Sequence, residues 1–146
     1  MRRDEVEEPT RGDWPEWLAE ELDRRGDTPT ERLLALWDVL EEWFASDDFD
    51  GSFLAGAVPE LRDAADPAHE AVAAQRRSLR HLLEGLASSA GVHDPATLAS
   101  QLQVLYEGAV VGALIDRQPA VARIARHLTL VALSASSEGG RRPGRR

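Results

Sequence analysis

The sequence contains no cysteine among its 146 residues, which excludes a disulfide framework, a thiolate zinc site and a cysteine nucleophile. Long apolar runs are also missing, and no hydrophobic segment follows the arginines of MRRDEVEEPT. The pattern predicts neither a signal peptide nor a membrane span, so we expect a cytoplasmic protein. Aromatic residues make up only 5% of the chain while alanine and leucine are plentiful, which favours helices over sheets.

Lysine is absent as well, and all 17 basic side chains other than histidine are arginine. The formal net charge is -9, and residues 1–27 carry ten acids against five arginines. Phosphate contacts require clustered basic side chains, whereas this chain is acidic and its last six residues, RRPGRR, carry four arginines and no acid. We therefore expect no direct DNA binding from this chain alone.

Proline and capping residues divide the chain into helices. Thr28-Pro29-Thr30-Glu31 forms a capping box, Asp-Pro pairs at 66–67 and 94–95 repeat an acidic cap before proline, and Pro119 is expected to open the last helix. Between these marks the apolar residues recur at helical spacing, which predicts helices over 14–25, 28–46, 67–90, 95–117 and 119–135, with a short bent helix over 53–62. The expected fold is an all-α antiparallel helical bundle.

The predicted organisation has one structured domain. Residues 1–13 are expected to be a disordered acidic tail, 14–27 a short helical stub, 28–135 the domain itself and 136–146 a flexible arginine-rich tail. The stub carries an apolar stripe that it cannot bury alone. We therefore expect it to pack on the domain.

The segment SDDFDGSF, residues 46–53, begins like a calcium loop. With Gly51 at the sixth position, Asp48 and Asp50 take the third and fifth, but the twelfth position holds Ala57 instead of a bidentate glutamate. The loop would lack its strongest ligand. The pattern is better explained as a polar turn between two helices.

Other candidate chemistry is weaker still. The four histidines, at 69, 81, 93 and 127, form no H-x-x-x-H pair, and zinc sites usually need three or four converging ligands. The adjacent acids 41–42 and 47–48 diverge on a helix, and GSFLAG lacks the lysine of a phosphate loop. No catalytic residue, metal ligand or cofactor site is predicted.

Two features of the later helices are more informative. Tyr106 lies in an apolar stripe, which is compatible either with a core tyrosine whose hydroxyl finds a partner or with an apolar ligand cavity. Small residues four apart at 108–109 and 112–113 allow another helix to approach closely, and helix 119–135 is more apolar than a small bundle needs. The contact so predicted lies within one chain or between two copies.

The order of these features resembles the C-terminal effector-binding and dimerisation domain of TetR-family transcriptional regulators. The resemblance covers roughly residues 17–133 and is most specific in FASDDFDGSF (44–53), in the AxxAQRRSLRHLLEGLA helix and in LxxLYEGAVVGALIDRxPA. Family members carry an N-terminal helix-turn-helix domain, whereas only a short acidic stretch precedes WLAEELDRRGDTP here. The resemblance thus implies a module without its own DNA-binding head, with 14–27 as the stub of the linking helix.

The resemblance also implies a homodimer and an effector pocket. The dimer would form through a four-helix bundle of 95–117 and 119–135, with interface candidates Leu105, Gly108, Ala109, Gly112, Ala113, Ile124, Leu128 and Val131. An unknown small apolar or amphipathic effector would bind between the other helices, with pocket candidates Trp37, Leu40, Phe44, Phe53, Leu79, Leu83, Leu102 and Tyr106.

A second hypothesis stays open beside this one. The same helices could form a dimeric interaction module whose core is filled and binds no small molecule. Thermal stabilisation by an added molecule would distinguish the two.

Overall fold

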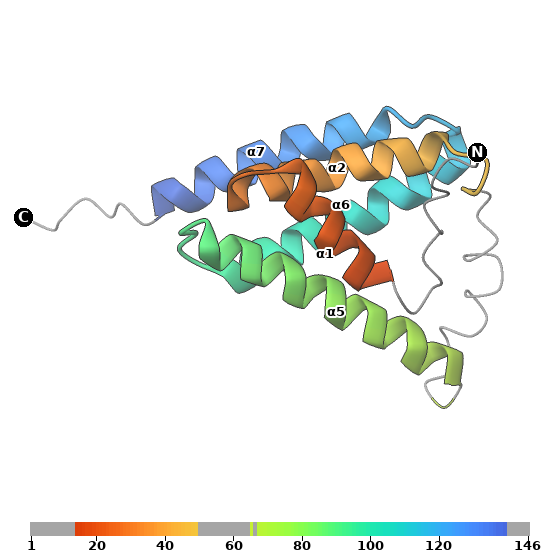
Figure 1. Cartoon of the computed structure of the whole chain (residues 1–146), viewed down its shortest axis with the longest axis horizontal. Coiled ribbons are helices and arrows are strands. Elements are labelled where there is room, and N and C mark those ends of the chain that lie inside the picture. Colours follow the sequence, from red (N-terminus) through yellow and green to blue (C-terminus); the bar gives the residue numbers. More distant parts are fainter. Residues whose placement is uncertain (1–13, 50–64, 66, 140–146) are drawn as a thin grey trace, which may run out of the picture.

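The computed structural model describes residues 14–49, 65 and 67–139, which contain helices and no strand. The helices are α1 (Trp14–Arg25), α2 (Pro29–Ala45), α5 (Pro67–Ser89), α6 (Pro95–Asp116) and α7 (Val121–Gly139). Figure 1 shows them packed as a bundle in which α5 and α6 run in opposite directions. The predicted all-α antiparallel bundle is confirmed.

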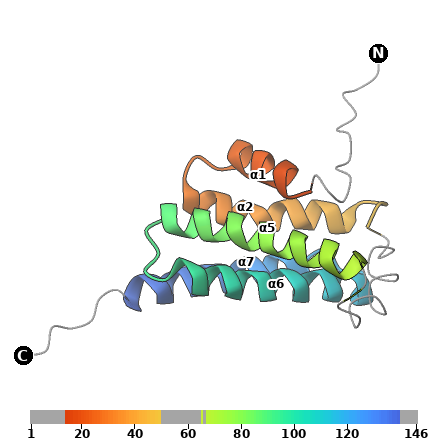
Figure 2. The same ribbon diagram turned by 90° about the horizontal axis from the view of Figure 1, so that it is seen from below.

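Helix α2 lies at the centre of the bundle and contacts each of the other four described helices. Seen from the side in Figure 2, α1 covers one face, α2 and α5 form the middle, and α6 and α7 form the opposite face. Seven residues of α2 are buried, among them Leu33, Leu36 and Leu40 with no exposed surface. The core therefore sits around α2, as the helical spacing of its apolar residues requires.

Two helix starts have the predicted capping chemistry. The Thr28 hydroxyl accepts a hydrogen bond from the Glu31 backbone N–H at 3.1 Å, and the Glu31 carboxylate accepts one from the Thr28 N–H at 3.2 Å. At α6, Asp94 accepts from the Thr97 backbone N–H at 3.1 Å and from its hydroxyl at 2.7 Å. Each cap satisfies backbone donors that the first turn leaves free.

The end of α5 has the predicted glycine. Gly91 has a φ of 78°, and its N–H donates to the Ser88 carbonyl at 3.0 Å while the Val92 N–H donates to the Ala87 carbonyl at 3.1 Å. This pair of bonds is the Schellman arrangement, which favours glycine in the left-handed position. Helix α6 ends on Arg117 with a φ of 52°, a left-handed conformation that costs an L-residue about 1–2 kcal/mol.

Helix α7 differs from its predicted limits at both ends. Its start lies at Val121 instead of Pro119, because the N–H groups of residues 121–123 donate to carbonyls only three residues back and form a tighter turn. It continues to Gly139, four residues beyond the expected Ala135, since the intervening serines and glutamate contain no breaker. The helix expected over 53–62, most of the calcium-like loop and both predicted tails lie outside the described residues, except that 136–139 belong to α7.

The first half of SDDFDGSF forms the corner expected of it. The Ser46 hydroxyl donates to the Trp43 carbonyl at 2.7 Å, and the Phe49 N–H donates to the Ser46 carbonyl at 3.2 Å. The Phe49 ring centroid lies 4.8 Å from those of both Trp43 and Phe44. The turn is therefore anchored by aromatic packing just after α2 ends.

Arginine side chains fasten α1 to α2. Arg25 contacts Glu21 on its own helix at 3.0 Å and Glu42 of α2 at 3.1 Å. A hydrogen bond from Arg24, helped by Arg25 and opposed by burial, lowers the pKa of the Glu21 carboxyl. Because the folded pKa is depressed, this contribution to stability is present above the ordinary glutamate range and is lost as pH falls through the folded pKa.

Gly26 lets the chain pass close to the first turn of α2. A Cβ at this position would lie 2.7 Å from the Arg32 backbone nitrogen and 2.9 Å from the Glu31 carbonyl carbon. We expect Gly26→Ala to lower the free energy of unfolding by about 1–3 kcal/mol, because backbone must shift to admit the methyl group. In urea denaturation, Gly85→Ala serves as the control: no atom lies within 4 Å of that Cβ, and removing a mid-helix glycine should stabilise the chain by about 1 kcal/mol. Equal stabilities of the two variants would contradict the close approach.

Helix α6 is the most apolar of the described helices. Its length and a mean hydropathy of 1.4 would allow it to cross a membrane by composition alone, and 39% of its apolar window is buried in the chain. Core helices of water-soluble proteins meet the same criterion. This feature is thus weak evidence for a membrane and is compatible with a soluble protein.

Candidate functional site

The structure gathers the predicted pocket residues into one place. Six of them, Trp37, Leu40, Phe44, Leu79, Leu83 and Leu102, are 0–7% exposed in the core formed by α2, α5 and α6. Tyr106 lies half-buried against this core, and Phe53 falls outside the described residues. The grouping was predictable from helical spacing, but these side chains pack on the core cluster, and neither hollow described below is lined by any of them.

Trp37 carries a buried hydrogen-bond donor with no acceptor. The residue is 1% exposed, and its indole Nε1 has no partner among the atoms that the structure describes. Leaving such a group unsatisfied costs about 1–3 kcal/mol. Most buried polar groups in proteins have a partner, so this donor marks a position where an external acceptor would be favourable.

Tyr106 is a core tyrosine whose hydroxyl does find a partner. The Trp14 indole N–H donates a hydrogen bond to the hydroxyl oxygen, which links α6 to the start of α1. Burial of the hydroxyl raises the pKa of Tyr106 to about 12, while the bond from Trp14 opposes that rise. Trp14 also stacks on Trp17 and contacts Trp43, with ring centroids 5.2 and 5.3 Å apart. Of the two alternatives for Tyr106, the hydroxyl therefore fits the core tyrosine with a hydrogen-bond partner.

Tyr106 is the sole tyrosine, so its ionisation can be followed by ultraviolet absorbance without interference from another phenol. We expect the absorbance to titrate with a midpoint near 12, the value its burial gives, against about 10 in the urea-unfolded chain. Because the folded pKa is raised, the unfolded state loses its proton first, and stability should fall as pH rises above about 10. If the absorbance of the folded chain titrated with a midpoint near 10, the Tyr106 hydroxyl would be exposed to water and not buried.

Gln103 makes a buried polar link that the sequence analysis did not assign. It is 2% exposed; its Oε1 accepts from Arg80 Nε at 3.0 Å, and its Nε2 donates to the Arg76 carbonyl at 2.9 Å. Arg76 in turn pairs with Glu107 at 2.5 Å. The network fixes α6 against α5. The sequence indicates this link only by the position of Gln103, which follows Ala99 by four residues and so lies on the same, buried side of the helix.

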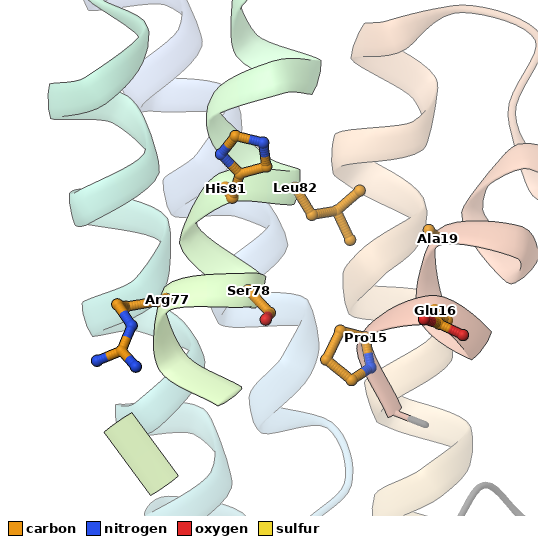
Figure 3. Close-up of a pocket in the computed structure, with 7 residues that line it drawn as sticks. All are labelled: Pro15, Glu16, Ala19, Arg77, Ser78, His81 and Leu82. Atoms are coloured by element: carbon orange, nitrogen blue, oxygen red, sulfur yellow. The ribbon is translucent and has the colours of Figure 1, made fainter. Parts of the chain in front are cut away.

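A shallow cleft of about 490 Å³ lies between α1 and α5. Pro15, Ala19 and Leu82 supply apolar lining, and Glu16, Arg77, Ser78 and His81 supply polar groups. Figure 3 shows Pro15 and Leu82 pointing toward the space between the helices, whereas Arg77 and His81 point to the other side of α5. Arg77 is also paired with Glu70 at 2.7 Å. The polar groups do not converge as they would around a bound substrate.

The predicted interface residues divide into two sets. Ala109 and Ala113 are buried inside the chain, and a Cβ on Gly112 would lie 3.5 Å from Val121 of α7. Gly112 thus lies at the contact of α6 with its own α7, and Ala109 and Ala113 belong to the core of the single chain. Leu105 is half-buried, and Gly108, Ile124, Leu128 and Val131 are exposed.

Large apolar side chains gather on the exposed side of α6 and α7. Val104, Val111 and Ile115 are 68%, 45% and 73% exposed and lie on one side of α6 with Gly108. Ile124, Leu128 and Val131 continue the surface on α7, four and three residues apart, and Leu130 beside them is also exposed. We call this surface, Val104, Gly108, Val111, Ile115, Ile124, Leu128 and Val131, the α6–α7 face. Figure 2 shows α6 and α7 on the side of the bundle opposite α1, and the described helices leave these seven residues exposed.

Three charged groups beside the α6–α7 face, Glu107, Arg123 and Arg126, are engaged with other helices. Arg123 pairs with Glu41 of α2 at 2.8 Å, and Arg126 lies 4.0 Å from Asp38. Glu107, on the other flank, is held by Arg76 of α5. The seven residues of the face are thus apolar, and the exposed His127 lies among those of α7. At the far end of α7 a hollow of about 390 Å³ is lined by Leu130, Val131, Ser134 and Ala135.

Within the described residues, no group of three or more acids and histidines is placed to hold a metal ion. Comparisons with models of protein families, with curated proteins and with solved structures find no match to this chain. Two features of the described helices thus point to binding. The α6–α7 face is an exposed apolar surface, and the Trp37 indole N–H is a buried donor without an acceptor.

Proposed function

We propose that this chain is the ligand-sensing and dimerisation module of a TetR-like transcriptional regulator and acts as a cytoplasmic homodimer. The observation that carries the proposal is the α6–α7 face, because soluble monomers rarely leave a contiguous surface of large aliphatic side chains in water. The regulatory part rests on the order and spacing of the sequence motifs in residues 17–133.

A second copy of the chain is the occupant that best fits the face. The surface has no unpaired charge at its centre, so two copies related by a two-fold axis can meet on it without like-charge repulsion. Pairing α6 and α7 with their counterparts would complete a four-helix bundle. An anionic membrane fits less well, because Arg123 and Arg126, the arginines of α7, are directed to acids of α2.

The sensing part is supported by Trp37. Its unpartnered donor lies among the apolar residues of α2, α5 and α6, which is the composition typical of pockets for apolar or amphipathic molecules. An effector with a hydrogen-bond acceptor would satisfy the donor and favour the conformation that binds it. No catalytic step forms part of the proposal.

A second candidate function is a helical dimeric interaction module with a filled core. It is favoured by the packing of the six pocket candidates, which are 0–7% exposed and line neither hollow. In this case only the α6–α7 face would be functional, and the unsatisfied Trp37 donor would lower the stability of the fold without serving a ligand.

A thermal-shift screen of small apolar and amphipathic molecules separates the two candidates. A ligand present at 100 times its dissociation constant stabilises the folded state by about 2.7 kcal/mol, which raises Tm by roughly 5–10 °C for a domain of this size. If the chain is a sensing module, at least one molecule should raise Tm in a concentration-dependent way, and the rise should be smaller in Trp37→Phe. The filled module predicts a constant Tm throughout the screen.

A further inference from the structure

We propose that His127 makes the pairing of two chains pH-dependent, so that dimers form in neutral solution and separate in mildly acidic solution. The inference rests on the proposed pairing through the α6–α7 face. It concerns a residue to which neither the sequence motifs nor the fold gives another role.

His127 lies within the apolar surface of α7. It follows Ile124 by three residues and precedes Val131 by four, so the three side chains share one side of the helix, with Leu128 adjacent. All four residues are exposed in the single chain. A second copy that covers Ile124 and Val131 would therefore cover the imidazole as well.

In the part of the chain that the structure describes, no acidic side chain pairs with the imidazole of His127. Among the described residues His127 has no hydrogen bond or ion pair, and the nearest arginines of its own helix, Arg123 and Arg126, are engaged by α2. The acids that α2 presents to α7 are Glu41 and Asp38, which hold those same arginines.

Helix α6 offers no better partner. Its Glu107 is held by Arg76, and its remaining acid, Asp116, lies at the C-terminal end of the helix, next to the turn that leads into α7. A charged imidazole covered by a second chain would thus be desolvated without an acid to pair with, which is strongly unfavourable.

The other three histidines lie elsewhere. His69 and His81 belong to α5, and His93 lies in the turn between α5 and α6. Histidine side chains ordinarily titrate at about 6.5, whereas carboxylates titrate near 4 and arginine above 12. His127 is the histidine that lies among the residues of the α6–α7 face, and histidine is the residue type whose charge ordinarily changes between about pH 8 and about pH 5.5.

The sign and size of the effect follow from proton linkage. The separated chains bind protons at His127 more readily than the dimer, so the dimer is fully stable above the pKa of the free histidine and weakens as pH falls below it. One pH unit below about 6.5, protonation of each imidazole raises the dissociation constant of the dimer about tenfold. A dimer contains two such imidazoles. We expect the dissociation constant to rise by up to about 100-fold.

Sedimentation equilibrium at about pH 8 and about pH 5.5, at constant ionic strength, tests the proposal. The unmodified chain should show the rise, and His127→Gln, which keeps a neutral polar side chain, should show the same dissociation constant at both pH values. His81→Gln, a matched change at an exposed histidine of α5, should retain the full pH dependence.

The outcomes are distinguishable. Monomers at about pH 8 would contradict the pairing itself, whereas dimers of equal affinity at both pH values would contradict only the role of His127. A pH dependence that survives in His127→Gln would also overturn the proposal. So would a loss of far-ultraviolet circular dichroism at the lower pH, because separation would then reflect unfolding.

Discussion

Replacing Val111 with aspartate is expected to convert dimers of this chain into monomers. Val111 is 45% exposed in the single chain, so a carboxylate there remains hydrated and the fold is kept. In the proposed dimer it would be buried against apolar side chains without a cation, and a buried unpaired charge costs several kcal/mol. Sedimentation equilibrium should show a dissociation constant at least about 100-fold higher than that of the unmodified chain, with an unchanged circular dichroism spectrum.

Two further variants on α6 control for this result. Val111→Thr is nearly isosteric and adds no charge, so it should remain dimeric. Ala113→Asp places the same carboxylate two positions along, where the side chain is 3% exposed in the core, and it should unfold the chain instead of dissociating it. If Val111→Asp dimerises as tightly as Val111→Thr, the α6–α7 face is not the interface.

Replacing Trp37 with alanine is expected to lower the free energy of unfolding by about 3–5 kcal/mol. Trp37 is the largest of the fully buried side chains, on the helix that contacts all the others. Its removal leaves a cavity that the surrounding leucines cannot fill. Urea denaturation followed by circular dichroism measures the loss, with Trp17→Ala as a half-buried control on α1 that should cost less.

Trp37→Phe isolates the indole N–H from the packing of the ring. If the donor is unsatisfied in the free chain, the smaller ring loses some packing but removes a polar group that costs about 1–3 kcal/mol to bury, so the net change should be close to zero. A loss as large as that of Trp37→Ala would show that the N–H has a partner in solution. In that case it would not be available to an effector.

Local chemistry explains why most helix limits were predictable. The Thr28 capping box, the Asp94 cap and the left-handed Gly91 each depend on residues within one turn of the helix end, and all three have the expected bonds. The start of α7 was less well predicted. Pro119 is compatible with the first turn of a helix, but the backbone there bonds three residues back and the α-helix begins at Val121.

The orientation of α6 could not be predicted in the same way. Apolar residues occur on every side of this helix, so their spacing does not say which side faces the core. The small residues Ala109 and Ala113 were expected at the interface between chains, yet they are buried within one chain, while Val104 and Ile115 are exposed. The packing of α6 on α5, fixed in part by Gln103, determines this choice.

The candidate pocket was predictable only as a location. Helical spacing brings Leu40, Leu83 and Leu102 together, and they do share the core. Whether side chains fill the space between them depends on three-dimensional packing, to which composition gives no access. The free donor of Trp37 likewise depends on where the neighbouring carbonyls lie, and no pattern of residue types could have indicated it.

The most direct test of the proposed module is the mass of the unmodified chain in solution at about pH 8, measured by sedimentation equilibrium over a range of protein concentrations. A self-complementary α6–α7 face predicts a species of twice the 16.0 kDa chain mass that dissociates only on dilution. A mass of 16.0 kDa at every concentration would contradict it, because the exposed aliphatic surface would then have no second copy to cover it.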